Sequence, residues 1–194
     1  HSGDSACVIP SVHISRENVE TIKEYTRKIA EEMHVQGLMN MQYAIENGKV
    51  FVLEANPRAS RTVPLVSKVC NVRMVPIATE IITRELTGKE SPVPALEEKV
   101  IPYYGVKEAA FPFNMFPEVD PLLGPEMRST GEVLGLSESY GEAFYKAQEA
   151  VQSKLPLSGT VLISVNRKDK AEVVEVAKLF HENNFRIIAT EGTC

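Results

Sequence analysis

The chain has 194 residues, of which 43% are hydrophobic, and a formal net charge of −5 at pH 7. This length suits one large or two small folded domains. Charges of both signs are mixed along the chain and the longest apolar runs are only strand-length, which argues against nucleic acid or a membrane as a partner. The first ten residues lack the basic and apolar regions of a signal peptide, so we expect a cytoplasmic protein, and both ends look like cuts through a larger one.

The first half of the chain is predicted to contain three helices and one β-hairpin. Ser15 can cap a helix in which four apolar residues recur at helical spacing and form a buried face. These residues are Val19, Ile22, Ile29 and Met33. Residues 62–70 and 75–87 are also predicted helices, and Gly88 is expected to end the second one in the left-handed conformation.

Residues 37–57 are predicted to form the hairpin, with Asn47 and Gly48 in its turn. A two-residue turn would mix polar and apolar side chains on both faces. A three-residue turn at 46–48, with Gly48 in the left-handed conformation, separates them, and we therefore favour it. One face then carries Asn40, Gln42, Val52, Glu54 and Asn56, and the other carries Met39, Met41, Tyr43, Ile45, Phe51 and Leu53.

The second half is predicted to hold an irregular segment and then a separate small domain. Prolines are frequent between residues 89 and 135, where only 103–111 has the pattern of a strand. A helix at 139–152 is followed by the linker SKLPLSG and a strand–helix–strand unit at 160–190. The expected fold class is α/β: an α+β portion with an antiparallel hairpin, followed from Val151 by a partial Rossmann-like parallel domain.

Oxygen-bearing side chains gather at the ends of the hairpin strands, and two arginines follow directly in the sequence FVLEANPRASRT. A buried glutamate needs a positive partner, and carboxylate and amide oxygens are ligands that magnesium accepts beside nucleotide phosphates. Glu54 would then be held by metal, while Arg58 and Arg61 would grip phosphate oxygens or an anionic substrate. A solvated sheet face, in which Glu54 forms a structural salt bridge with Arg58 or Arg61, explains the spacing equally well.

Two segments, GLMNMQYAIENGKVFVLEANPRASRTVPLVSK and LLGPEMRSTGEVLG, together resemble the large subunit of carbamoyl-phosphate synthase. The E-x-N-P-R pattern alone indicates only an ATP-grasp enzyme. MRSTGEVLG and the strand–helix–strand tail resemble the C-terminal synthetase half of that subunit and the start of its allosteric domain, which is similar in fold to methylglyoxal synthase. The resemblance implies that residues 1–150 are part of the second ATP-grasp domain, which uses ATP to phosphorylate carbamate, and that 151–194 begin the allosteric domain.

The resemblance also implies roles for individual residues. Two Mg²⁺ or Mn²⁺ ions would be held by Gln42, Glu54 and Asn56, of which Gln42 and Glu54 would also bind ATP. Catalytic arginines facing the transferred phosphate would be Arg58 and Arg61. A nucleotide-contacting segment would end at His1 and Ser2. An effector, a nucleotide monophosphate such as UMP or IMP, would be bound by Ser164, Lys170, Thr190 and Thr193.

The implied partners are the rest of the large subunit and a glutaminase small subunit, in a pathway of pyrimidine or arginine synthesis. In the family, the adenine pocket and the lid over the phosphates lie upstream of His1, so we expect this chain alone to be inactive. Two other readings stay open: a different ATP-grasp ligase, such as a biotin carboxylase or a D-alanine ligase, and a non-catalytic effector-binding module.

Overall fold

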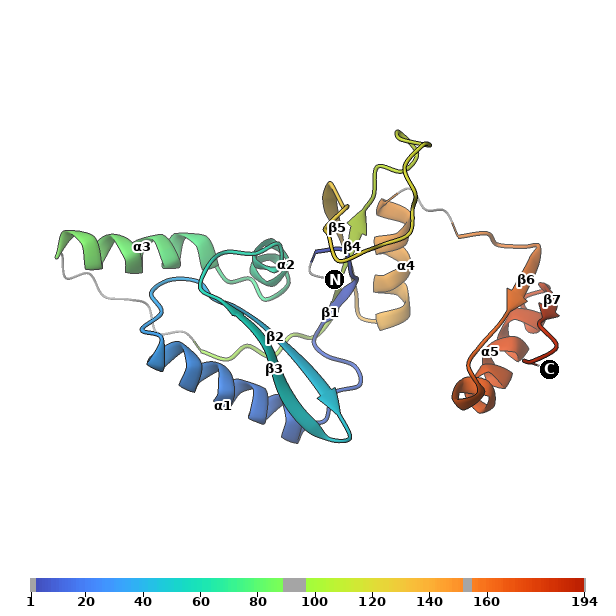
Figure 1. Ribbon diagram of the computed structural model, residues 1–194, viewed down its shortest axis with the longest axis horizontal. Coiled ribbons are helices and arrows are strands. Elements are labelled where there is room, and N and C mark those ends of the chain that lie inside the picture. Colours follow the sequence, from blue (N-terminus) through green and yellow to red (C-terminus); the bar gives the residue numbers. More distant parts are fainter. Residues whose placement is uncertain (1–2, 89–96, 152–154, 194) are drawn as a thin grey trace. The chain divides into compact units, whose positions relative to one another are not determined.

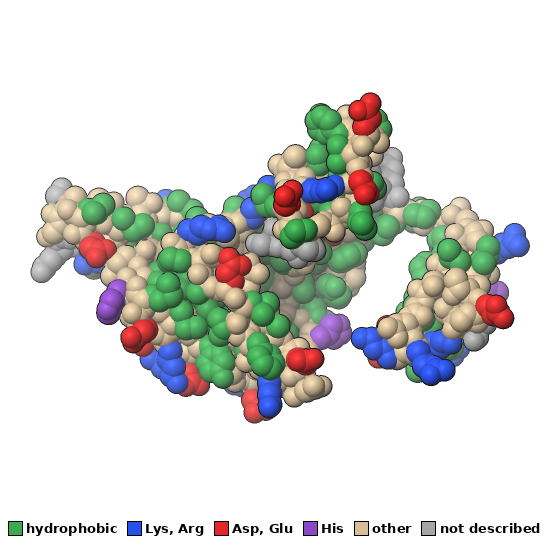
Figure 2. Space-filling view, in the orientation of Figure 1, with side chains coloured by type: hydrophobic (Ala, Val, Ile, Leu, Met, Phe, Trp, Pro, Cys, Tyr) green, Lys and Arg blue, Asp and Glu red, His purple; other side chains and the backbone are tan. Residues whose placement is uncertain are grey.

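The computed structural model describes residues 3–88, 97–151 and 155–193 (Figure 1). Its contacts divide the chain into two compact units, His1–Ser153 and Lys154–Cys194, which are described separately below. Side chains of both charges are interspersed over the face drawn in Figure 2. Within the described ranges, no helix is both long and apolar enough to cross a membrane.

A three-stranded antiparallel sheet forms the centre of the first unit. Its order is β1 (Cys7–Ile9), β4 (Tyr104–Ala110) and β5 (Gly131–Ser137). Helix α4 (Tyr140–Ala150) packs on one face of it, where Val106, Ala143 and Ala147 form the buried core. The helix approaches so closely that a Cβ at Gly135 would overlap with the backbone of Ala143 and Ala147, so only glycine fits there.

Strand β5 corrects the sequence prediction, which left most of 89–135 irregular apart from one strand. Gly131–Ser137 pairs in register with β4, so that Gly131 lies opposite Ala110 and Ser137 opposite Tyr104. The proline-rich stretch before β5 hides this strand, and its two glycines lower its local β propensity. Pairing with a strand more than twenty residues away supplies what the local sequence lacks.

A second layer contains the hairpin of β2 (Asn40–Glu46) and β3 (Lys49–Asn56), with helix α1 (Arg16–Glu32) beside it (Figure 1). The predicted cap is confirmed, because the Ser15 hydroxyl accepts a hydrogen bond from the Asn18 amide at 3.2 Å. The helix meets the hairpin where Thr26 and Tyr43 share a hydrogen bond of 2.6 Å between their hydroxyls. The predicted buried face of α1 is wrong in degree, since no α1 residue is fully buried in this unit.

The remaining helices of the first unit match the prediction. Helix α2 (Thr62–Val69) packs against β4 with Leu65 and Val69 buried, and α3 (Met74–Thr87) follows it. Gly88 ends α3 with φ of 66°, the left-handed cap that the sequence predicts.

The second unit is a parallel strand–helix–strand unit, as predicted. β6 (Thr160–Ile163) pairs with β7 (Arg186–Ala189), and α5 (Lys170–Glu182) connects them after one 3₁₀ turn. Phe180 and Phe185 pack edge to face with ring centroids 5.4 Å apart. Antiparallel strands with helices in the first unit and a parallel pair in the second confirm the α/β class.

Candidate active site

The hairpin reaches its polar arrangement by a different route from the predicted one. Its turn has only two residues, Asn47 and Gly48, with φ of 50° and 75°, so the three-residue turn is wrong. An irregularity between Gln42 and Tyr43 then adds one residue, Leu53, to β3. This bulge shifts the register by one, so that Gln42 lies opposite Glu54.

The bulge confines the predicted segregation to one end of the hairpin. There, Asn40 pairs with Asn56 and Gln42 with Glu54, which brings the four predicted polar residues together. Beyond the bulge, Val52 pairs with Tyr43 and Phe51 with Ala44, which exchanges these two apolar residues between the faces. The prediction placed Val52 with the polar set and Phe51 with Tyr43, and both placements are wrong because they assumed an unbroken alternation along β3.

Hydrogen bonds order the polar end of the hairpin. The Asn56 side-chain amide donates to the Glu54 carboxylate at 2.6 Å. The Asn40 amide donates to the hydroxyls of Ser60 and Thr62 at 3.1 and 3.3 Å. Because Asn56 uses its nitrogen for Glu54, its carbonyl oxygen is left for another electropositive partner.

The two predicted arginines occupy different environments. Arg58 is exposed and donates to the Ala59 carbonyl at 2.9 Å. Arg61 is half-buried and donates through both terminal nitrogens to Ser129, at 2.6 Å to the hydroxyl and 3.0 Å to the carbonyl. Neither arginine forms an ion pair with Glu54 among the described residues, so the salt-bridge part of the alternative is wrong. Glu54 is exposed, as a solvated sheet face predicts, and the expectation of a buried glutamate is wrong.

A pocket of about 440 Å³ connects the hairpin to the central sheet. Gln42 lines it from the hairpin, and Arg58 and Arg61 line it from the segment that leads into α2. Glu54 and Asn56 lie on the strand opposite Asn40 and Gln42, both of which line the pocket. The lining of this pocket therefore combines Gln42 with Arg58 and Arg61, whereas Glu54 and Asn56 are not part of it. His1 and Ser2 lie outside the described residues.

Sequence reasoning missed a third cation in this pocket. Lys107 on β4 is only 3% exposed and lines the pocket beside Arg61. Within the described part of the chain no hydrogen bond or ion pair holds its ammonium, so this positive charge is available to a ligand in the pocket. A lysine in the apolar strand YGVKEAA was the available signal, but an amphipathic edge strand would show the same pattern.

The oxygen donors at the polar end of the hairpin suit a divalent cation. Gln42, Glu54 and Asn56 offer one carboxylate and two amide carbonyls, which are hard ligands of the type that Mg²⁺ and Mn²⁺ accept. No group of three or more His, Cys, Asp or Glu side chains with metal-site geometry occurs in the described ranges. Any cation here would therefore depend on amide oxygens and on a ligand such as phosphate.

Three of the four predicted effector residues meet at the carboxyl edge of the parallel strands in the second unit. The Thr190 hydroxyl lies 2.9 Å from that of Thr193 and 3.3 Å from that of Ser164. Thr193 also accepts from the Val165 amide at 3.2 Å. Lys170 begins α5 and takes no part in these hydrogen bonds.

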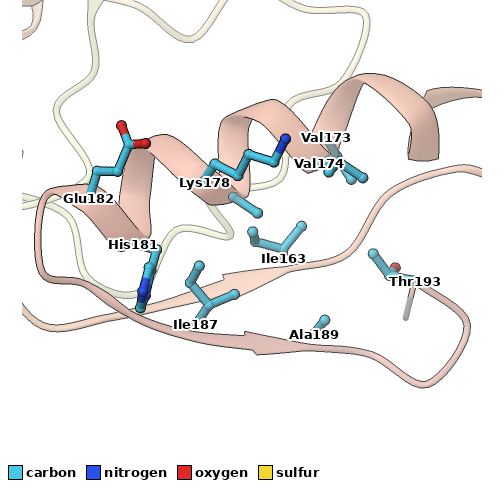
Figure 3. Close-up of a pocket in the computed structure, with 10 residues that line it drawn as sticks. Ile163, Val173, Val174, Lys178, His181, Glu182, Ile187, Ala189 and Thr193 are labelled. Atoms are coloured by element: carbon cyan, nitrogen blue, oxygen red, sulfur yellow. The ribbon is translucent and has the colours of Figure 1, made fainter.

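The second unit also has a mainly apolar pocket of about 510 Å³ between α5 and the two strands (Figure 3). Ile163 and Ile187 project into it from the strands, while His181 and Lys178 come from the helix. Thr193 belongs to both the lining and the hydroxyl cluster.

Comparison with known proteins gives consistent matches. The family described as carbamoyl-phosphate synthase L chain, ATP binding domain, matches residues 1–86. A carbamoyl phosphate synthase large chain of Archaeoglobus fulgidus is 52% identical over 195 residues, covering 100% of this chain and 18% of its own length. A carbamoyl phosphate synthase large chain, C-terminal section, of Methanocaldococcus jannaschii is 49% identical, covering 100% of this chain and 32% of its own.

Among solved structures, the biotin carboxylase domain of a single-chain bacterial carboxylase gives a TM-score of 0.44 at 17% identity over 54% of this chain and 25% of that one. The sequence matches extend over this whole chain, but the chain spans only 18% of the length of its relative from Archaeoglobus fulgidus.

Proposed function

Because the chain belongs to the carbamoyl-phosphate synthase large-chain family, we propose that its first unit serves the ATP-dependent phosphorylation of carbamate to carbamoyl phosphate within a complete large chain. The observation that supports this most directly is the pairing of Gln42 with Glu54 beside a pocket that Arg58 and Arg61 also line. Such a pocket can hold a phosphate group and a divalent cation side by side. This family assignment replaces the alternatives of another ATP-grasp ligase and a non-catalytic module.

The hairpin end would hold two Mg²⁺ or Mn²⁺ ions through Gln42, Glu54 and Asn56. When bound, these ions would neutralise charge on the phosphate oxygens of ATP. Only one of the three ligands is charged, so the hairpin adds little negative charge that would repel the nucleotide. The hydrogen bond from Asn56 orients the Glu54 carboxylate at the end of the hairpin that lies away from the turn.

Arg58 and Arg61 would orient the reacting groups. Phosphoryl transfer needs in-line positioning and stabilisation of charge on the transferred oxygens more than covalent chemistry by the protein. Carbamate is already an anion, so no general base is required, and a guanidinium can bind it or the phosphoryl group through two parallel hydrogen bonds. Lys107 would add a third positive charge to the same pocket.

We further propose that the second unit binds a nucleotide monophosphate of the UMP or IMP class that regulates the synthetase. The supporting observation is the cluster of Ser164, Thr190 and Thr193 at the carboxyl edge of a parallel sheet, where open α/β folds bind ligands. Lys170 at the start of α5 would meet the phosphate. The remaining large chain and a glutaminase small subunit complete the proposed assembly.

The substitution Glu54→Gln tests the proposed reaction in the complete large chain. Removing the charge should lower carbamoyl-phosphate formation by at least ~100-fold, because the metal site loses its only carboxylate. Glu46→Gln is the matched control, since Glu46 is an exposed glutamate at the other end of the same hairpin. ADP and carbamoyl phosphate would both be measured with folding checked by circular dichroism, and normal rates in Glu54→Gln would refute the proposal.

A further inference from the structure

The Asp4 carboxylate is buried and binds backbone amides from a segment far away in the sequence. Asp4 is 6% exposed. One carboxylate oxygen accepts from the Ser129 amide at 2.9 Å and the other from the Arg128 amide at 2.8 Å. Both oxygens therefore hold the chain immediately before β5.

Ser129 in turn holds the guanidinium of Arg61. Ser129 is 5% exposed, and its hydroxyl donates to the Gly3 carbonyl at 3.1 Å while accepting a hydrogen bond from Arg61. Its carbonyl accepts the second Arg61 nitrogen. Each polar group of Ser129 thus has a partner in either the Asp4 turn or Arg61.

Asp4 does not belong to the lining of the 440 Å³ pocket, although Gly3 and Ser5 on either side of it do. Its carboxylate faces the backbone of 128–129, where each of its two oxygens accepts one backbone amide. The hydrogen bonds from Ser129 and Arg128, together with the nearby Arg61 charge, keep this buried carboxylate ionised. What it binds here is the segment that anchors Arg61.

We propose that Asp4 is a positioning residue that fixes Arg61 in the pocket by holding Ser129 through two backbone amides. This inference rests on the proposed function of Arg61, but it concerns a group that would never touch substrate. Two of the five guanidinium donors of Arg61 are committed to Ser129, which sets the plane in which the others face the pocket. Loosening Ser129 would leave Arg61 present but misdirected.

The test compares Asp4→Asn, Ser129→Ala and the double variant in the complete large chain. Asparagine keeps the size of the side chain but places an amide NH₂ against a backbone N–H, so one of the two anchoring bonds is lost. We expect Asp4→Asn to lower kcat by ~10-fold or more with the KM for ATP within about twofold, because a misdirected arginine affects transferred charge more than nucleotide binding. Asp120→Asn is the matched control, since the exposed Asp120 side chain accepts the nearby Leu122 amide, while the Arg128 guanidinium donates to the Asp120 backbone carbonyl, which the substitution keeps.

Non-additivity separates positioning from simple loss of structure. If both residues act through Arg61, the double variant should be no slower than the slower single variant. Rates would be divided by the folded fraction measured by circular dichroism at the assay temperature. A normal kcat in folded Asp4→Asn, or losses that multiply in the double variant, would overturn the positioning role.

The same assays distinguish this inference from the proposed function. If Arg61→Ala and Glu54→Gln are inactive while folded Asp4→Asn is normal, the function stands and the positioning role fails. If Arg61→Ala itself keeps normal turnover, the proposed function of Arg61 fails first.

Discussion

Asn56 donates a 2.6 Å hydrogen bond to Glu54, two residues earlier on the same strand, at the end of the hairpin where Gln42 faces them. This contact places an amide and a carboxylate within reach of a single cation. It also means that the Asn56 nitrogen offsets the Glu54 charge when no cation is bound, as a hydrogen bond to an ionised group does.

Asn56→Asp should make the stability of the hairpin depend on metal. The substitution replaces the donor to Glu54 with a second carboxylate, so two negative charges repel each other without a cation. We expect the unfolding temperature in EDTA to fall by about 2–4 °C for each kcal/mol lost, and Mg²⁺ or Mn²⁺ to restore it. Asn40→Asp, at the position directly opposite Asn56, is the comparison variant, because the Asn40 amide donates to Ser60 and Thr62 and not to Glu54. A loss in Asn56→Asp that metal does not repair would argue against a cation between 54 and 56.

Lys107→Met should reduce activity without reducing stability. The Lys107 side chain is 3% exposed and makes no hydrogen bond or ion pair with the described residues, so an apolar side chain of similar length should stabilise β4 or leave it unchanged. Carbamoyl-phosphate formation should fall by at least ~10-fold because the pocket loses positive charge. Lys146→Met is the control, because the Lys146 side chain lies on the exposed side of α4. A fall in both unfolding temperature and activity of Lys107→Met would make Lys107 a structural residue.

The stability that Asp4 provides should disappear at low pH. Burial alone would raise the pKa of this carboxyl, but the hydrogen bonds from Ser129 and Arg128 and the nearby Arg61 charge lower it below its ordinary value of 3.8. A lowered folded-state pKa stabilises the fold fully above the unfolded-state pKa, and that stability is lost as the pH falls through the folded-state value. Asp4→Asn does not titrate, so its unfolding temperature should be furthest below wild type near neutral pH.

The measurement is thermal unfolding of wild type and Asp4→Asn from neutral pH down to acid. The gap between their unfolding temperatures should stay constant until the pH approaches 3.8 and then narrow. A gap that stays constant throughout would show that the carboxylate charge contributes nothing to the effect of the substitution.

The hairpin shows both what the sequence could predict and why the rest was hidden. The requirement that polar and apolar side chains lie on different faces predicted a polar cluster, and the structure has it. Its members are Asn40, Gln42, Glu54 and Asn56. The predicted three-residue turn was wrong because a bulge within a strand and a longer turn have the same effect, namely a shift of the strand register by one residue. Separation of side chains alone cannot tell where along a strand that residue is inserted.

The supporting residues of the site depend on contacts between distant segments. Asp4 and Ser129 are 125 positions apart, and neither belongs to a local sequence pattern that predicts a buried side chain. Lys107 lies on β4, against which α2 packs, and it lines the same pocket as Gln42 of the hairpin, so its surroundings come from segments that are distant in the sequence. The predicted residues lie on one hairpin and the segment after it. Of the missed residues, Asp4 and Ser129 hold Arg61 in that segment, and Lys107 lines the same pocket from β4.

The hydroxyl cluster of the second unit leads to a prediction about regulation. The hydroxyls of Ser164, Thr190 and Thr193 bond one another, and each can exchange such a bond for one to a ligand. A phosphate ligand also needs a positively charged group nearby. Lys170→Ala in the complete protein should therefore weaken inhibition or activation by a nucleotide monophosphate by ~10-fold or more, while activity without effector stays near normal. Lys178→Ala is the matched control, because Lys178 lies on the same helix and pairs with Glu175 at 2.7 Å. The measurement is a titration of UMP and of IMP against wild type and both variants. If the Lys170→Ala curves coincide with those of wild type for both nucleotides, Lys170 is not part of the effector site. If Lys178→Ala shifts the curves equally, the phosphate is attracted by the general positive charge of the unit and not by the start of α5.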